Sequence, residues 1–165
     1  MPKFVKRSEI AMFLDTTPSS ASTWKLVGDG MTTGSYTYDA EEESETYIIH
    51  DNATTIVNAY SVSLDGEMKC IFGDNVYDYI NDLRYNLAVG DDANSHVLLI
   101  DKYDEVTEGN FRAQKFDCSI SISSYGGDGG ATPTIGFKVN LNGDPVQGTA
   151  TISNGVPTFS PTASV

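Results

Sequence analysis

The sequence predicts a mainly β protein, an antiparallel β-sandwich or split barrel with one flanking α-helix. Apolar and polar residues alternate with a period of two along most of the chain, which is typical of half-buried strands. One segment, about 75–88, instead has its apolar residues at helical spacing. The chain has 165 residues, of which 39% are hydrophobic, enough for one domain to bury a core. We expect a single β domain over residues 1–153 and a Pro/Ser/Thr-rich tail over 154–165.

The clearest alternation lies in two runs that a Gly-rich connector joins. Every second residue is apolar in 116–122, and the same pattern recurs in 135–141. The connector, 125–133, reads "YGGDGGATP". We predict a long antiparallel hairpin with one apolar face and one face of small polar residues.

The remaining strands are predicted to be shorter. Asp65-Gly66 is a tight-turn dipeptide, so we expect it to join strand 54–64 to strand 67–73 as a hairpin. The stretch "NGDPV", residues 142–146, predicts a turn or loop before a short last strand. The other predicted strands are 35–39, 45–50, 95–105 and 148–153.

The helix is predicted from both its spacing and its ends. Asp74 or Asn75 is a suitable N-cap, and Gly90 is suited to end the helix. The residues expected to face the sheet are Val76, Tyr79, Ile80, Leu83 and Leu87.

A block of like charge interrupts the strand pattern. The stretch "TYDAEEESETYIIHD", residues 37–51, holds six acidic residues and no Lys or Arg. We predict a long acidic hairpin loop over about 39–54, extended by its own repulsion. The nearest cluster of basic residues in the sequence, Lys3, Lys6 and Arg7, is the predicted partner of these acids, between copies of the chain rather than within one.

The overall charge argues against two classes of partner. The chain carries 23 acidic and 10 basic residues, a formal net charge of −13. Such a surface repels nucleic-acid backbones and anionic membranes. No apolar run is long enough to span a membrane, and the first residues do not form a secretory signal. Cys70 and Cys118 match no metal spacing and are expected to be reduced core residues.

No pattern in the sequence indicates catalysis. His50 and His96 belong to no ligand motif, and "GGDGG" lacks the residues of a phosphate loop. Asp91, Asp92 and Asp128 could offer oxygen ligands to calcium, but solvated turn acids are the favoured interpretation. We expect no enzymatic activity, no cofactor and no metal.

The order of the segments resembles a known family. "STWKLVGDGMTTGSYTYDAEEESETYI" is followed by "NAYSVSLDGEMKCIFGDNVYDYINDL", "HVLLIDKY" and a closing "NGDPVQGTATI". This series, from about Trp24 to Ile152, resembles the major tail protein, or tail tube protein, of long-tailed bacteriophages of Gram-positive hosts.

The resemblance implies a structural virion protein of the phage tail, made in the bacterial cytoplasm. Family members form six-membered rings that stack into a tube, and DNA leaves the capsid through the acidic lumen. Expected partners are other copies of the chain and the tape measure, tail terminator and distal tail proteins. DNA would pass without specific binding.

The resemblance also assigns roles to residues of this sequence. The loop that reaches the adjacent ring would include Tyr38, Asp39, Glu41, Glu42, Glu43, Glu45, Tyr47 and Asp51. The hairpin facing the lumen would present Asp117, Ser119, Ser121, Ser123, Lys138 and Asn140.

Two other interpretations stay open. The chain could cap or join a tail tube without polymerising, or it could be an unrelated all-β binding module. A sugar-binding module would usually present an aromatic platform. Trp24 is the only Trp, and most Tyr and Phe fall at core-like or loop-flanking positions, which counts against that platform.

Overall fold

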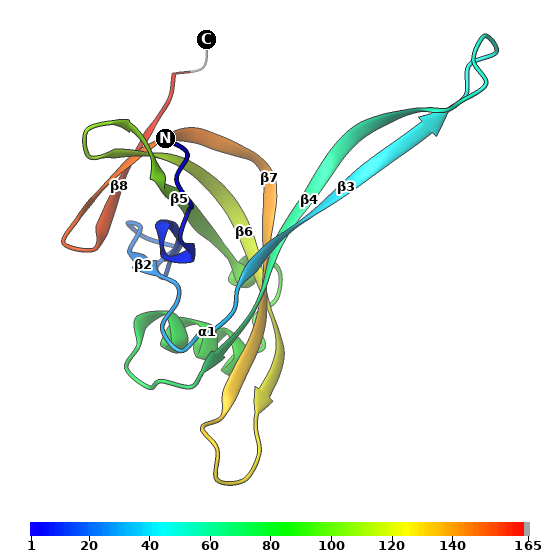
Figure 1. Ribbon diagram of the computed structural model, residues 1–165. Coiled ribbons are helices and arrows are strands. Elements are labelled where there is room, and N and C mark those ends of the chain that lie inside the picture. The colour runs from blue at the N-terminus through cyan, green and yellow to red at the C-terminus, as the bar shows by residue number, and fades with distance from the viewer. Residues whose placement is uncertain (164–165) are drawn as a thin grey trace.

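The computed structural model describes residues 1–163 as one antiparallel sheet of eight strands with one α-helix (Figure 1). The mainly β architecture with a flanking helix is therefore confirmed. Along the sheet the strand order is β2-β1-β5-β6-β7-β4-β3, and β8 pairs with β7. The strands are β1 (Ile10–Asp15), β2 (Trp24–Leu26), β3 (Ser35–Glu45), β4 (Thr54–Lys69), β5 (Asn94–Thr107), β6 (Asn110–Gly126), β7 (Thr134–Ser153) and β8 (Val156–Pro161). The helices are α1 (Asn75–Tyr85) and two short 3-10 helices, η1 (Arg7–Glu9) and η2 (Gly90–Ala93).

The sheet is curled, and each of its faces buries a core. β2 and β8 contact each other although they are far apart in the strand order. Within the described residues the sheet does not close into a barrel, because β2 and β3 each pair on one side only. The larger core lies under α1 and includes Ile80, Phe137 and Val139. The smaller core is on the opposite face, built around Phe13 and covered in part by residues of β2 and β8.

The long hairpin predicted from the alternation is confirmed as β6 and β7. Ile120 pairs with Val139, and Cys118 pairs with Leu141, so both apolar sets share one face. Cys118 is buried and Cys70 is half-buried against the same core, and both are free thiols. Burial raises the pKa of the Cys118 thiol to about 12, which keeps it protonated.

The predicted turn at Asp65-Gly66 is wrong, since β4 runs without interruption through both residues. Asp65 pairs with Lys138 and Gly66 with Phe137. A Cβ added at Gly66 would lie 2.6 Å from the Phe137 ring. Glycine is needed here for a close approach of strand and ring, so the dipeptide does not mark a hairpin.

The predicted loop at 142–146 is also wrong, because it is an irregularity inside β7. Asp117 pairs with Asn142 and Lys115 with Val146, so three residues of β7 lie opposite a single residue of β6. At this bulge β7 changes its second neighbour: β4 pairs up to Leu141, and β8 pairs from Gly148 onward. The bulge keeps one strand continuous while its partner changes.

The segment predicted as a tail contains a strand. Val156–Pro161 form β8, joined to β7 by a turn in which Asn154 and Gly155 both have positive φ, as tight hairpin turns require. At Gly148 a Cβ would lie 2.2 Å from the Ser160 carbonyl oxygen, so only glycine lets β8 approach this closely. Ser164 and Val165 of the predicted tail lie outside the described residues.

The helix is confirmed but ends at Tyr85, three residues before the predicted end. The Asp74 side chain caps its start by accepting a hydrogen bond from the Tyr77 amide at 2.8 Å. Its end is a Schellman motif: the Leu87 amide donates to the Arg84 carbonyl, and the Ala88 amide donates to the Leu83 carbonyl. Leu87 was expected in the core, but it has φ +48° and is 82% exposed. No helix among the described residues is long and apolar enough to cross a membrane.

Candidate functional site

The β3–β4 hairpin projects from the sheet as a two-stranded ribbon (Figure 1). β4 pairs with β7 only from Val62 onward, so among the described residues no third strand lies beside residues 39–61, which we call the arm. Every residue of the arm is exposed. An isolated two-stranded hairpin is at best marginally stable in water. The arm is therefore the part of the fold that most lacks a packing partner.

The predicted acidic loop is largely a strand. Residues 39–45 belong to β3 and pair with β4, and only 46–53 form the loop, so the predicted strand over 45–50 is wrong. β4 explains the difference, because its residues 54–60, "TTIVNAY", are rich in strand-forming types. A bulge between Glu41 and Glu42 adds Asn58 to β4 without changing the faces.

The arm has an acidic face and a mixed apolar face. Successive residues of a strand point to opposite faces, and the pairing keeps this alternation across the hairpin. The acidic face carries Asp39, Glu41, Glu43 and Glu45, together with the exposed Ile56 opposite Glu43. The opposite face carries Tyr38, Val57 and Tyr60, all exposed, together with Glu42. The arm is thus an amphipathic ribbon whose apolar side meets solvent.

The acids of the arm have no ion-pair partner within residues 1–163. None of the salt bridges in this part of the chain involves an arm residue. Asn58 Nδ2 donates to Glu43 Oε2 at 3.3 Å, which is the arm's one side-chain contact to an acid in the described structure. All eight residues assigned to the assembly loop lie at the foot of the arm or on it: Tyr38, Asp39, Glu41, Glu42, Glu43, Glu45, Tyr47 and Asp51.

The tip of the arm is apolar where a loop is usually polar. The His50 amide donates to the Tyr47 carbonyl at 2.9 Å and closes a tight turn. Ile48 and Ile49 occupy the corner of this turn and are 104% and 80% exposed. Turn corners favour Gly, Asn, Asp, Ser and Pro, so two adjacent isoleucines indicate a requirement other than turn formation.

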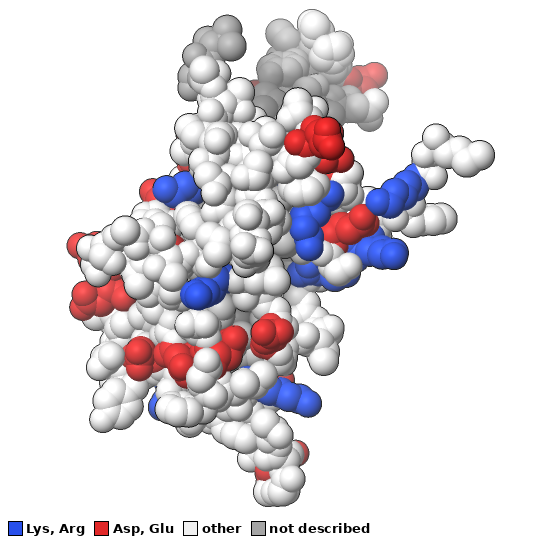
Figure 2. Space-filling view, turned by 90° about the vertical axis from the view of Figure 1, so that its left-hand side faces the viewer, with Lys and Arg blue, Asp and Glu red and all other residues white. Residues whose placement is uncertain are grey.

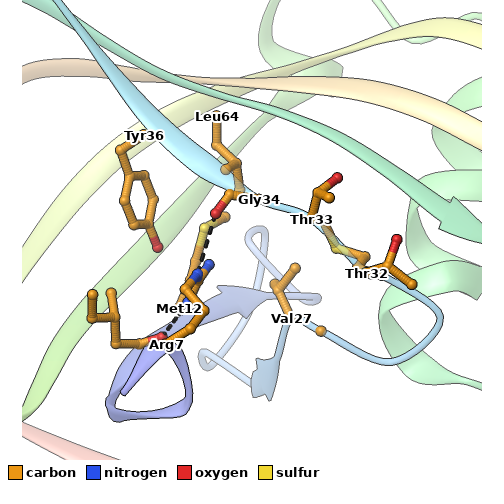
Figure 3. Close-up of a pocket in the computed structure, with 11 residues that line it drawn as sticks. Arg7, Met12, Val27, Thr32, Thr33, Gly34, Tyr36 and Leu64 are labelled. Atoms are coloured by element: carbon orange, nitrogen blue, oxygen red, sulfur yellow. Dashed lines mark hydrogen bonds between the residues drawn. The ribbon is translucent and has the colours of Figure 1, made fainter. Parts of the chain in front are cut away.

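The foot of the arm is tied to the N-terminal segment (Figure 3). Arg7 Nη1 donates to the Ile10 carbonyl at 2.7 Å, and its Nε donates to the carbonyl of Gly34, just before β3, at 3.2 Å. These groups line a cavity of about 190 Å³ that Tyr36 and Leu64 also border. The buried Tyr36 hydroxyl has no hydrogen-bond partner among the described residues, and burial raises its pKa to about 12.

The basic residues predicted as partners of the acids already have contacts in their own chain. Lys3 Nζ lies 2.9 Å from Glu9 Oε1, and the Lys6 amide donates to Glu9 Oε2 at 2.8 Å. The Lys6 amide first and the Lys3 amine second lower the pKa of Glu9. Arg7 donates to the carbonyls of Ile10 and Gly34. Their pairing with the arm of another copy stays a prediction.

The residues assigned to a lumen face are cross-strand neighbours. Ser119 pairs with Asn140 and Ser121 with Lys138, on the face of the β6–β7 hairpin that points away from the larger core. A bulge after Ile122 places Ser123 beside Ser124 over Gly136. Asp117 is exposed further along the same strand. The face is polar, with Lys138 and Asp117 among hydroxyl and amide groups.

The side of the molecule turned away from the arm does not repeat the charge segregation of the arm. Figure 2 views this side, where basic and acidic side chains are interspersed. Among residues 1–163 no cluster of His, Cys, Asp and Glu is arranged to hold a metal ion. His50 lies in the tip turn, and His96 contacts the buried Asp15.

Sequence reasoning missed a groove beside the end of α1. It has a volume of about 820 Å³ and lies between Leu83–Asn94 and the end of β6, with Leu87 and Val89 on its rim. The sequence predicts Leu87 in the core because its spacing from Leu83 fits a helix, whereas in the structure it is exposed. No local signal in the sequence marks this end, because Leu87 occupies the left-handed position that is usually Gly.

The comparisons with known proteins yield a structural likeness only. No family model matches the chain, and no curated protein matches it. A solved structure, the tail of an empty GTA (gene transfer agent) particle computed with helical refinement in C6 symmetry, has the same fold with a TM-score of 0.58. The two are 14% identical in sequence, and the match covers 86% of this chain and 97% of the other. The chain therefore shares its fold with a subunit of a phage-like tail.

Proposed function

We propose that this chain is a structural subunit of a phage-tail-like tube, a relative of the major tail proteins of long-tailed phages of Gram-positive hosts. The observation that carries the proposal is the arm, an amphipathic ribbon that no other described element covers. The likeness of the fold to a tail with C6 symmetry supports it. The arm of one copy would bury its apolar face on another copy, and repetition of this contact would build stacked, six-membered rings.

The tube would conduct DNA without binding it. Each subunit brings a formal net charge of −13, which repels phosphates at long range. The polar face around Ser119, Ser121 and Asn140 would give a hydrated wall with few apolar contacts for bases. The tape measure, tail terminator and distal tail proteins would bind at the ends or inside. The proposal assigns no catalytic activity to the chain.

Electron microscopy of the purified protein tests the proposal directly. We expect rings or tubes in negative stain at high protein concentration. A variant in which an Asn-Gly turn replaces residues 40–60 should stay folded, because all of these residues are exposed, but should form no tubes. Glu108→Ser, an acid removed from the turn between β5 and β6, is the matched control and should assemble normally.

Two outcomes would contradict the proposal. A protein that stays monomeric at every concentration, even with tail-initiating complexes added, would argue for an unrelated binding module. A protein that forms single closed rings but never stacks them would instead indicate a subunit that caps or joins the tube. If the shortened hairpin unfolds the domain, the arm belongs to the folding core and has a different role.

A further inference from the structure

The end of α1 carries a leucine where the backbone favours glycine. The Schellman motif places Leu87 at the first position after the C-cap, with φ +48°. This position is usually Gly, because a Cβ is disfavoured in the left-handed region. The Leu87 side chain contributes little to the core in return, since it is 82% exposed. A leucine that is exposed and also in the left-handed region favours a contact that the single chain does not make.

Leu87 does not stand alone on the surface. Tyr85 and Val89 are each 77% exposed, and Leu87 and Val89 line the groove whose other wall is β6. Within the described part of the chain, β5 pairs with β6 only up to Ser119, so Ile120–Gly126 present an unpaired strand edge to this groove. Arg84 lies in the wall formed by α1, with its guanidinium 3.9 Å from the centre of the Tyr125 ring, and Asp91 lines the groove as well. The groove thus offers apolar contact, backbone hydrogen-bonding groups and one Arg together with one Asp.

The tip of the arm offers the complementary set. Ile48 and Ile49 present apolar side chains at the corner, and the ends of β3 and β4 are extended strands with free outer edges among the described residues. Glu45 and Asp51 flank the isoleucines with negative charge. An extended segment that adds to a strand edge gains main-chain hydrogen bonds, and its side chains fill the adjoining pocket.

The two sites lie too far apart to meet within one chain. In Figure 1 the arm tip lies at the upper right, and α1 lies toward the lower left, well away from it. Two complementary surfaces at separate places on one molecule produce a head-to-tail contact, which repeats as an open stack when its rotation does not close a ring. This is the contact that a stack of subunits requires.

We propose that the arm tip of one copy, with Ile48 and Ile49, docks in the groove of a second copy between Leu87–Val89 and the free edge of β6. The inference rests on the proposed function and adds to it the surface that receives the arm. Leu87 is then the residue whose strained backbone serves assembly, and Arg84 pairs with Glu45 or Asp51 across the contact.

Disulfide trapping between two variants tests the docking. Protein with Ile49→Cys is mixed with protein carrying Leu87→Cys, allowed to assemble and then oxidised. We expect a cross-linked dimer from the mixture only, and only in fractions that contain tubes. Ile49→Cys mixed with Val106→Cys is the control, because Val106 is exposed on β5 outside the groove. Each single variant oxidised alone controls for the native Cys70 and Cys118.

The outcomes separate the two proposals. Tubes that form without the Ile49–Leu87 cross-link, or with an equal yield from the Val106 control, overturn the docking and leave the tube function standing. A wild-type protein that never assembles overturns the tube function, and the docking falls with it.

Leu87→Gly gives a second, independent readout. The monomer should melt at the same temperature or higher, because glycine relieves the left-handed backbone, while assembly should slow by roughly tenfold or more. Val106→Ser removes an exposed apolar side chain elsewhere and should assemble at the wild-type rate. Assembly of Leu87→Gly at the wild-type rate would overturn the docking.

Discussion

His96 Nδ1 lies 3.2 Å from Oδ2 of Asp15, a carboxylate that is fully buried at the end of β1. The other oxygen of Asp15 accepts hydrogen bonds from the amides of Thr17 and Thr23, both at 3.0 Å. Asp15 therefore closes the loop that leads from β1 to β2 and joins it to β5. The imidazole also approaches Asp117 of β6, at 3.6 Å, so one histidine lies between carboxylates of two strands.

This arrangement predicts acid sensitivity. Burial alone would raise the pKa of Asp15, but hydrogen bonds from Thr17, Thr23, Ser22 and His96 outweigh it and lower the pKa below its usual range. A carboxyl whose pKa is lower in the folded state stabilises the fold above its unfolded pKa. That stabilisation is lost as the pH falls through the folded pKa.

Asp15→Asn tests the effect. The amide oxygen can still accept from the two loop amides, but the charge beside His96 is gone. We expect the variant to be less stable than wild type by about 1–3 kcal/mol near neutral pH, and the difference to shrink below about pH 4. Urea denaturation across this range measures it, with Asp128→Asn in the exposed Gly-rich connector as control. A pH-independent difference would show that charge plays no part.

Gly66 and the Phe137 ring predict a steric effect on stability. Gly66→Ala would place a Cβ 2.6 Å from Cζ and 2.9 Å from Cε2 of Phe137, which is buried in the larger core. The ring or the strand must shift, and overpacking of this kind costs about 1–3 kcal/mol. Gly129→Ala is the matched control, since nothing lies within 4 Å of its added Cβ. Equal melting temperatures for the two variants would refute the close packing.

The same position shows where sequence patterns are informative and where they are not. The alternation in residues 116–122 identifies β6 because each apolar side chain there meets the core directly. Asp65-Gly66 has the composition of a turn, yet glycine is needed there because the Phe137 ring packs against its backbone. Phe137 is distant in the sequence, so no local pattern reveals this contact. The acids 41–45 disfavour a strand on their own, and pairing with Thr54–Tyr60 imposes one.

The candidate site was predictable in part for the same reason. The like-charge run pointed to the correct hairpin, since a block without bases has no place inside a core. Its apolar face was not predictable, because Tyr38, Val57 and Tyr60 align only once the register of the hairpin is known. Leu87 was misplaced because helical spacing continues past the residue at which the helix ends.

The unpartnered Tyr36 hydroxyl gives a third prediction. A buried polar group without a hydrogen bond is unfavourable, so Tyr36→Phe should leave stability unchanged or raise it by about 1 kcal/mol. Arg7→Met should instead lower stability by about 1–2 kcal/mol, because it removes hydrogen bonds to the carbonyls of Ile10 and Gly34. Thermal melting of both variants measures this contrast. A clear loss of stability in Tyr36→Phe would mean that the hydroxyl has a partner, such as an ordered water in the adjoining cavity.

The charge of the arm makes assembly sensitive to salt. Glu41, Glu43 and Glu45 share one face at a spacing of about 7 Å, within the Debye length of about 10 Å at 0.1 M salt. Each approaching subunit carries a formal net charge of −13. Added salt, from about 20 to about 200 mM, should therefore accelerate assembly by screening the repulsion.

Replacing Glu41 and Glu43 by glutamine, while Glu45 is kept to pair with Arg84, isolates the repulsion within the arm. The change reduces the formal net charge from −13 to −11, because −13 + 2 = −11. Assembly followed by light scattering should be faster than wild type at low salt and less dependent on salt. The free energy of unfolding should change little, by about 0.5 kcal/mol or less, because the altered side chains are exposed. Assembly that slows as salt is added would contradict the prediction that repulsion between subunits limits the rate. It would indicate that pairing of the acids with Lys3, Lys6 or Arg7 of another copy outweighs the repulsion between subunits.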